Sequence, residues 1–237
     1  MSTFVLVHGA FHGGWCWEKV VPLLERQGHR ALALDLPGHG QDETPIGTLT
    51  LESYVTRVLQ AVEAEREPVV LVGHSLGGLT IATVAERRPE RIKKLVYLCA
   101  AMLRPGEVWL DVAANDTDSL TRKHQQVSSD GVYSTIAREA LKPIFYGGCS
   151  DEDVARAADR LVPQSMAMRR TPLPTSIERW GKVPRLYVHC LRDRAITIAQ
   201  QRRLVAAAPC PTVELDTDHS PFYSAPAALA EALIAAA

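Results

Sequence analysis

Val69-Val-Leu-Val-Gly73-His74-Ser75-Leu76-Gly77-Gly78 is the stretch of sequence that decides the fold. It begins with four aliphatic residues, which predict a strand buried on both faces. The pattern Gly-x-Ser-x-Gly follows, and residues 79–88 lack proline and predict a helix. A strand, a sharp turn and a helix in this order predict a nucleophile elbow, with the Ser75 hydroxyl exposed at its tip.

The two glycines of the pattern have a physical role in such a turn. Gly73 and Gly77 leave room for the chain to fold back beside a strained Ser75. The hydroxyl would lie at the N-terminus of the helix, where backbone N–H groups favour developing negative charge. A chance match in a loop is the alternative, but the strand before the motif and the helix after it argue against one.

Composition restricts the class of protein. The chain has 237 residues, of which 46% are hydrophobic and 22% charged, as in an ordinary globular domain with a sizeable core. The net charge is −1 and no basic stripe is present, which argues against a nucleic-acid partner. No apolar run approaches the roughly 20 residues of a membrane span, so we expect no membrane partner either.

The cysteines and the first residues bear on the cellular compartment. Five cysteines form no C-x-x-C pair, and Cys99 and Cys190 end strand-like runs, so we expect buried, reduced thiols. A strand already begins at Thr3, which leaves no room for a signal peptide. We therefore expect a cytoplasmic location, unless a leader was removed before residue 1.

Strands and helices alternate over most of the chain. Further strands are predicted at 4–8, 30–35, 94–99, 185–190 and 212–215, and helices at 15–27, 50–62, 198–208 and 224–237. This alternation predicts an α/β fold with a mostly parallel, doubly wound sheet and right-handed crossovers.

The alternation stops between residues 102 and 182, which we call the cap segment. It contains no buried strand-like run, and helices are predicted at 119–126, 132–141 and 151–161. Because such a length is too great for a structureless loop, we expect a helical cap inserted after the fourth strand of a core formed by 1–101 and 183–237. A second independent domain is the alternative, but the apolar content of the segment is thin.

A serine nucleophile needs a base and an acid from elsewhere in the chain. The carboxyl ends of parallel strands meet at one edge of the sheet, so the partners of Ser75 should follow other strands. His219 is the only histidine after the last strand, and Asp193 follows the preceding strand. The order Ser75, Asp193, His219 is that of an α/β-hydrolase triad, and it predicts nucleophile, orienting acid and base.

Other candidates for the acid are weaker. Asp216 is the second choice, whereas Asp218 adjoins His219 too closely for an easy contact with its ring. Ala100 and Ala101 stand after the fourth strand, so no acid is available there. Six further histidines, which we expect to be structural or solvated, are His8, His29, His39, His74, His124 and His189.

The loop after the first strand supplies the second half of the predicted site. A tetrahedral intermediate carries an oxyanion that needs two fixed donors. The amide of Leu76 follows the nucleophile, and the amide of Ala10 belongs to the His8-Gly9-Ala10 turn. A plain glycine turn between strand and helix is the alternative.

The sequence offers candidate pocket residues but no metal or cofactor motif. The apolar residues that could line a pocket, or pack inside the cap, are Phe11, Trp109, Phe145, Tyr146 and Met166. His8 and His12 lie on a turn and not on one helix face, so no metal is expected. The glycines around Ser75 lack the Lys-Ser/Thr ending of a phosphate loop, so no cofactor is expected.

Three motifs resemble a known family. Val-Gly-His-Ser-Leu-Gly-Gly at 72–78 is general to the α/β-hydrolase superfamily, which the chain resembles over its whole length. The closer resemblance is to the plant methylesterase and hydroxynitrile lyase group and its bacterial relatives, and its most specific match is Phe-Val-Leu-Val-His-Gly-Ala-Phe-His-Gly-Gly-Trp-Cys-Trp at 4–17. Asp-His-Ser-Pro-Phe at 218–222 resembles the bacterial esterase branch, which includes pyrethroid hydrolases.

The resemblance implies an esterase. Hydroxynitrile lyases of this group have a threonine and a lysine where this chain has Gly9 and Ser220, so no cation is present to stabilise departing cyanide. The expected function is a serine carboxylesterase acting on small to medium apolar esters through an acyl-enzyme. The resemblance also implies oxyanion donors at Ala10 and Leu76. Cyanohydrin cleavage, acyl transfer, a non-catalytic ligand receptor and a homodimer stay open as alternatives.

Overall fold

A computed structural model describes all 237 residues and contains one main sheet of six strands. From one edge to the other the strands are β2 (Arg30–Leu34), β1 (Thr3–Val7), β3 (Val69–His74), β4 (Ile92–Leu98), β8 (Arg185–Cys190) and β9 (Thr212–Leu215). Every pairing is parallel, which confirms the predicted sheet. All six residues of β3 are buried, as its unbroken apolar run predicts for a central strand.

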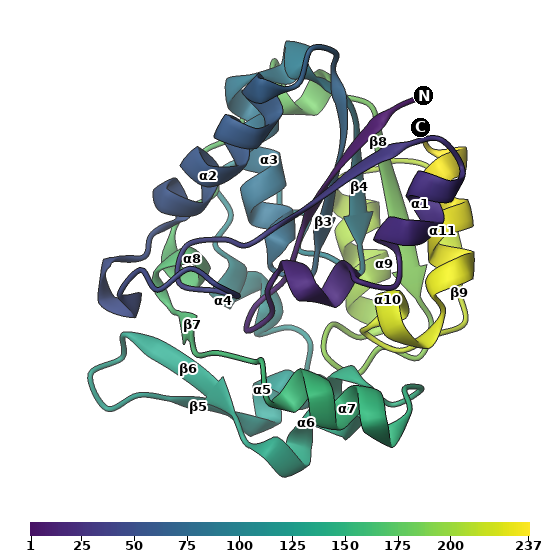
Figure 1. Cartoon of the computed structure of the whole chain (residues 1–237). Coiled ribbons are helices and arrows are strands. Elements are labelled where there is room, and N and C mark those ends of the chain that lie inside the picture. The colour runs from purple at the N-terminus through teal and green to yellow at the C-terminus, as the bar shows by residue number, and fades with distance from the viewer.

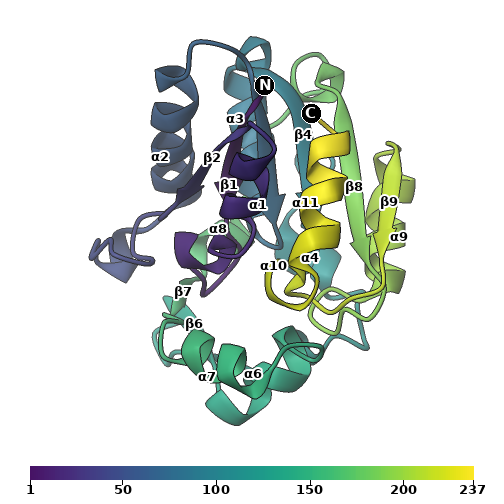
Figure 2. The ribbon, with the colours of Figure 1, turned by 45° about the vertical axis from the view of Figure 1, so that its right-hand side comes forward.

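Helices cover both faces of this sheet. They are α1 (Val21–Arg26), α2 (Leu51–Ala64), α3 (Gly77–Arg87), α9 (Ile198–Ala207), α10 (Pro221–Ser224) and α11 (Pro226–Ala235). Helices α1 and α11 pack together on one face, and α2 packs with α3 on the other (Figures 1 and 2). No helix in the structure is both long and apolar enough to cross a membrane.

Prolines explain where two predicted helices differ from the observed ones. The helix expected over 15–27 is divided into a 3-10 turn at Gly14–Trp17 and α1, with Pro22 in the first turn of α1. The helix expected over 224–237 begins at Pro226, after the separate short helix α10. Proline lacks an N–H group, so a helix accepts it in its first turn and not in its interior.

The cap segment lies across the carboxyl ends of the main strands, at the bottom of Figure 1. Its helices are α4 (Trp109–Ala113), α5 (Leu120–His124), α6 (Arg138–Phe145), α7 (Asp151–Ala158) and α8 (Ala167–Arg170). Its strands are β5 (Gln125–Val127), β6 (Tyr133–Ile136) and β7 (Gln164–Ser165), which form a small antiparallel sheet. Further 3-10 turns outside or at the end of this segment are Ile46–Thr48, Pro89–Arg91 and Trp180–Lys182.

The prediction of helices alone in this segment was wrong at residues 125–126, which belong to β5, and at residues 132–136, which lead into and form β6. Asp130 accepts hydrogen bonds from the Ser128 hydroxyl at 2.6 Å and from the Val132 amide at 3.0 Å, and these contacts close a turn between β5 and β6. The residues after the turn include Tyr133, which favours a strand. The turn therefore pairs this stretch with β5, and the helix begins only at Arg138.

The cysteines are all free, and four of the five are buried. Cys99 and Cys190 are both 0% exposed, which confirms that the two strand-end thiols belong to the core. Burial raises the pKa of both thiols, so they stay protonated.

Candidate active site

Ser75 occupies the turn between β3 and α3 in a strained conformation. Its φ of 51° lies in the left-handed region, which a residue with a side chain rarely adopts. The turn is held from the β4 side: the Ser75 amide donates to the Leu98 carbonyl at 3.1 Å, and the Ser75 carbonyl accepts from the Ala101 amide at 2.9 Å. The Ser75 hydroxyl makes no hydrogen bond within the chain, and the residue faces a cavity.

The loop after β1 packs directly against this turn. A Cβ atom placed on Gly9 would lie 2.6 Å from Ser75 Cβ, and one placed on Gly77 would lie 2.6 Å from the His8 carbonyl oxygen. Any side chain at either position would push the loop and the turn apart.

Two residues that line the same cavity have unpaired backbone amides. Ala10 and Leu76 both line it, and neither amide N–H donates a hydrogen bond within the chain. The Ala10 carbonyl accepts a hydrogen bond from His12 Nδ1 at 2.8 Å, which fixes the orientation of this part of the loop. Two unpaired N–H groups beside a serine are the arrangement that an oxyanion needs.

Asp193 and His219 meet beside Ser75. His219 Nδ1 lies 2.7 Å from Asp193 Oδ2, and the two side chains are 2% and 0% exposed. His219 also lines the cavity that Ser75 faces. Ser75 and His219 thus line one cavity and Asp193 contacts His219, although the three residues come from the loops after β3, β8 and β9.

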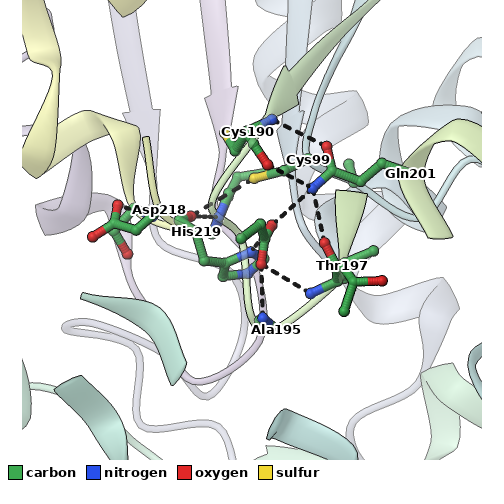
Figure 3. Close-up of polar contacts among 12 residues, drawn as sticks. Cys99, Cys190, Ala195, Thr197, Gln201, Asp218 and His219 are labelled. Carbon is green, nitrogen blue, oxygen red and sulfur yellow. Dashed lines mark hydrogen bonds and ion pairs between the residues drawn. The ribbon is translucent and has the colours of Figure 1, made fainter. Parts of the chain in front are cut away.

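The Asp193 carboxylate accepts hydrogen bonds at both of its oxygens. Oδ1 accepts from the amides of Ala195 at 2.7 Å and Ile196 at 3.0 Å, while Oδ2 accepts from Gln201 Nε2 at 3.1 Å as well as from His219. Figure 3 shows Gln201 beside Cys190, the last residue of β8, whose amide donates to the Gln201 side-chain oxygen at 3.1 Å. A carboxylate oxygen can only accept, so His219 Nδ1 donates in its contact with Asp193, and Nε2 is left as the acceptor of the neutral ring.

Asp216, the second choice for the acid, does not contact His219. Its side chain is 71% exposed and forms an ion pair with Arg192 at 3.3 Å. The carboxylate therefore faces solvent, on the outside of the β9 loop.

Asp218 is buried and points away from the His219 ring. Its Oδ2 accepts from the Gly148 amide of the cap segment at 2.7 Å. Its Oδ1 accepts from the Ser220 amide at 3.0 Å and from the Ser224 hydroxyl at 2.7 Å. Asp218 thus ties the loop that carries His219 to the cap segment.

Two other buried histidines, His74 and His12, make hydrogen bonds to residues around the site. His74 Nε2 donates to the His219 carbonyl at 2.8 Å, and the two rings lie 4.7 Å apart. Burial lowers the pKa of His74 well below its usual value and lowers that of His12 to about 3. Both rings are therefore neutral, and His12 can accept from the Tyr146 hydroxyl through Nε2 at 2.7 Å.

The cavity has a volume of about 100 Å³ and a mixed lining. Of the apolar residues predicted for a pocket, Phe11, Trp109 and Phe145 line it. Tyr146 and Met166 do not: the Tyr146 hydroxyl is engaged by His12, and buried Met166 contacts the Gln125 side chain through its sulfur at 3.4 Å. Polar residues complete the wall, namely Asp116, Ser119, Thr121, Arg122, Gln125 and Arg169.

A metal ion does not fit the group of ligand-type atoms present here. His74, Cys99 and His219 have such atoms within 4.8 Å of one another. Burial raises the pKa of the Cys99 thiol, so this residue stays protonated, whereas a metal binds the thiolate.

Several contributors to the site were missed in the sequence. Gln201, which contacts Asp193, lies on a helix face and has no motif around it. Arg169 belongs to a short cap helix of ordinary polar appearance. Asp218 had the clearest signal, because it lies in the Asp-His-Ser-Pro-Phe motif, but its role depends on a contact with the distant Gly148.

The chain belongs to the alpha/beta hydrolase family, which residues 4–232 match. It is 33% identical over 243 residues to a pyrethroid hydrolase of Sphingobium wenxiniae, covering 98% of this chain and 86% of that protein. It is also 33% identical over 253 residues to methylesterase 1 of Arabidopsis thaliana, covering 96% of this chain and 93% of that protein.

A solved structure of a related enzyme has the same fold. The fold superposes on that of a pyrethroid hydrolase from Sphingobium faniae with a TM-score of 0.91 at 31% identity, covering 99% of this chain and 96% of the other. The predicted fold and family are therefore confirmed, and the esterase function expected from the sequence is supported by these relatives.

Proposed function

We propose that this protein is a serine carboxylesterase in which Ser75 is the nucleophile, His219 the base and Asp193 the orienting acid. The observation that carries the proposal is the 2.7 Å contact between His219 and Asp193 at the wall of the cavity that Ser75 faces. The unpaired amides of Ala10 and Leu76 in the same wall support an oxyanion hole.

The reaction follows from this geometry. Ser75 Oγ attacks the ester carbonyl carbon while His219 Nε2 takes the hydroxyl proton. The Ala10 and Leu76 amides donate to the oxyanion of the tetrahedral intermediate. When the intermediate collapses, His219 returns the proton to the leaving alcohol and an acyl-enzyme remains. Water then attacks the acyl group by the same steps, and Asp193 stabilises the imidazolium that forms each time.

The relatives support esters as substrates, since their names are those of a methylesterase and a pyrethroid hydrolase. We propose that the cap segment closes over the acyl or alcohol group, because Trp109 and Phe145 bring apolar surface to the cavity. Cyanohydrin cleavage is not favoured. Ser220 occupies the position at which hydroxynitrile lyases of this group have a lysine. The Ser220 hydroxyl is buried and has no hydrogen-bond partner.

The test is the hydrolysis of p-nitrophenyl butyrate by the wild type and by Ser75→Ala. We expect wild-type turnover and a loss of at least about a thousand-fold in the variant, since the nucleophile is removed. Ser220→Ala is the matched control, because it removes a neighbouring hydroxyl that has no hydrogen bond, and it should keep activity within a few-fold. Activity retained by Ser75→Ala would exclude the proposed mechanism, and cyanide release from mandelonitrile would indicate a lyase.

A further inference from the structure

Arg169 is a buried cation without an acidic partner. The residue is 6% exposed and lines the cavity that Ser75 and His219 also line. No carboxylate forms an ion pair with it, although buried arginines are almost always paired with an acid. A charge held in this way in a substrate cavity calls for a reason beyond packing.

Most N–H groups of the Arg169 guanidinium have no hydrogen-bond partner. The guanidinium offers five N–H groups, and its hydrogen bond is made by Nη1 to the Gln125 side-chain oxygen. Nε is buried without a partner, and Nη2 forms no hydrogen bond within the chain. The aromatic ring of Phe11 lies 5.8 Å from the guanidinium carbon and holds the cation in place without using any donor.

Burial lowers the pKa of Arg169 to about 10, and no neighbouring charge contributes to the change. The group is still protonated at neutral pH, so it keeps its positive charge in the cavity wall.

Neither of the other charged side chains of the lining, Asp116 and Arg122, forms an ion pair with this cation. The Asp116 carboxylate is engaged by Thr197, whose amide donates at 2.9 Å and whose hydroxyl donates at 2.6 Å. Arg122 is exposed and forms no ion pair, so it adds a second positive charge to the cavity. Trp109 and Phe145 make much of the remaining wall apolar.

We propose that the ester substrate carries a carboxylate outside its ester group, and that the unpaired N–H groups of Arg169 bind this carboxylate. Nε and Nη2 form one edge of the planar guanidinium without a partner, and a carboxylate can accept two parallel hydrogen bonds from such an edge. The substrate class is then an apolar ester with one anionic end, such as the monoester of a dicarboxylic acid. This inference rests on the proposed esterase function of the same cavity.

Two matched pairs of esters test the inference with the intact protein. In the first, the p-nitrophenyl monoester of adipic acid is compared with p-nitrophenyl hexanoate, which places the carboxylate on the acyl side. In the second, 4-carboxyphenyl hexanoate is compared with phenyl hexanoate, which places it on the alcohol side. We expect kcat/KM to be at least about tenfold higher for the carboxylate member of one pair, because a charge-assisted contact is gained.

Variants locate the effect. Arg169→Met, of similar length, should bring the ratio of kcat/KM between the carboxylate ester and its neutral partner down to about one. Arg169→Lys should keep part of it, since the charge remains without the planar fork. Arg170→Met is the matched control: this neighbouring arginine is exposed, bonds to the Gly131 carbonyl at 2.9 Å and should leave the preference intact.

The outcomes separate the two proposals. Wild-type hydrolysis of neutral esters with no preference for either carboxylate ester would overturn the inference and leave the esterase function standing. Absence of hydrolysis for all four esters would instead count against the proposed function. If Arg169→Met fails to fold, inhibition of wild-type ester hydrolysis by adipate tests the inference instead. Competitive inhibition that is weaker in Arg169→Lys than in the wild type would support the inference. Absence of inhibition in the wild type would oppose it.

Discussion

Replacing Asp193 by asparagine tests the hydrogen-bond network that orients His219. In the wild type, Oδ1 accepts from two backbone amides and Oδ2 accepts from Gln201 Nε2 and His219 Nδ1. Asparagine has one acceptor oxygen and one NH2 group. To keep both backbone contacts, its oxygen must occupy the Oδ1 position, which turns the NH2 group toward Gln201 and His219.

The new NH2 group changes the hydrogen bonds of both His219 and Gln201. His219 Nδ1 must become an acceptor, so the ring proton moves to Nε2 and the base can no longer take the serine proton. We expect kcat to fall by about ten-thousand-fold, as a wrong tautomer does in a serine hydrolase. The NH2 group of Gln201 would also face the new NH2 group. Gln201 cannot turn over cheaply, because its oxygen accepts from the Cys190 amide at 3.1 Å and its nitrogen donates to the Ile196 carbonyl at 2.8 Å.

A donor left unsatisfied in this buried site should lower the free energy of unfolding by about 1–3 kcal/mol. Steady-state hydrolysis of p-nitrophenyl butyrate measures the first effect, and urea unfolding measures the second. Asp216→Asn is the matched control: its carboxylate is exposed and pairs only with Arg192, so activity and stability should be nearly unchanged. Near-wild-type activity of Asp193→Asn, or greater damage from Asp216→Asn, would refute the assignment of the acid.

Three further predictions concern the surroundings of the site. Gly9→Ala should lower kcat/KM for the same ester at least about a hundred-fold, because the new Cβ would meet Ser75 Cβ at 2.6 Å; unchanged kinetics would contradict the observed contact. Asp218→Ala leaves the Gly148 amide without its partner, so urea unfolding should show a loss of about 1–3 kcal/mol, and wild-type stability would argue against this tie to the cap. Burial lowers the pKa of His12 to about 3 from 6.5, so below pH 6.5 the unfolded chain binds a proton that the folded chain does not. The free energy of unfolding should then fall by about 1.4 kcal/mol per pH unit for this residue on going from pH 6 to pH 4, and His12→Gln should show a shallower slope in urea titrations at those pH values.

The central sheet was predictable because its strands carry simple signals. The run from Val69 to Val72 is apolar without interruption, and a strand of that kind fits only the middle of a sheet covered on both faces. The cap segment has no such signal. Its sheet of three short strands depends on the Asp130 turn and on pairing with β7, which lies about thirty residues away in the chain. Short strands of mixed polarity do not have a periodicity that separates them from a helix.

The candidate site likewise contains residues that the sequence predicts and residues that it does not. The positions of Ser75, Asp193 and His219 follow from the rule that loops at the carboxyl ends of parallel strands converge. The roles of Gln201 and Arg169 follow from distances between side chains that no local pattern records. The cavity likewise contains Phe11, Trp109 and Phe145 but not Tyr146 or Met166, because the packing of the cap decides which aromatic and apolar groups face inward.

The central claim is that an acyl group is transferred to Ser75. Mass spectrometry of the protein quenched during turnover of p-nitrophenyl butyrate, followed by digestion, measures this directly. The account predicts a butyryl adduct on the peptide that contains Ser75, formed in the wild type and absent in Ser75→Ala. Turnover accompanied by an adduct on a different residue would contradict the account.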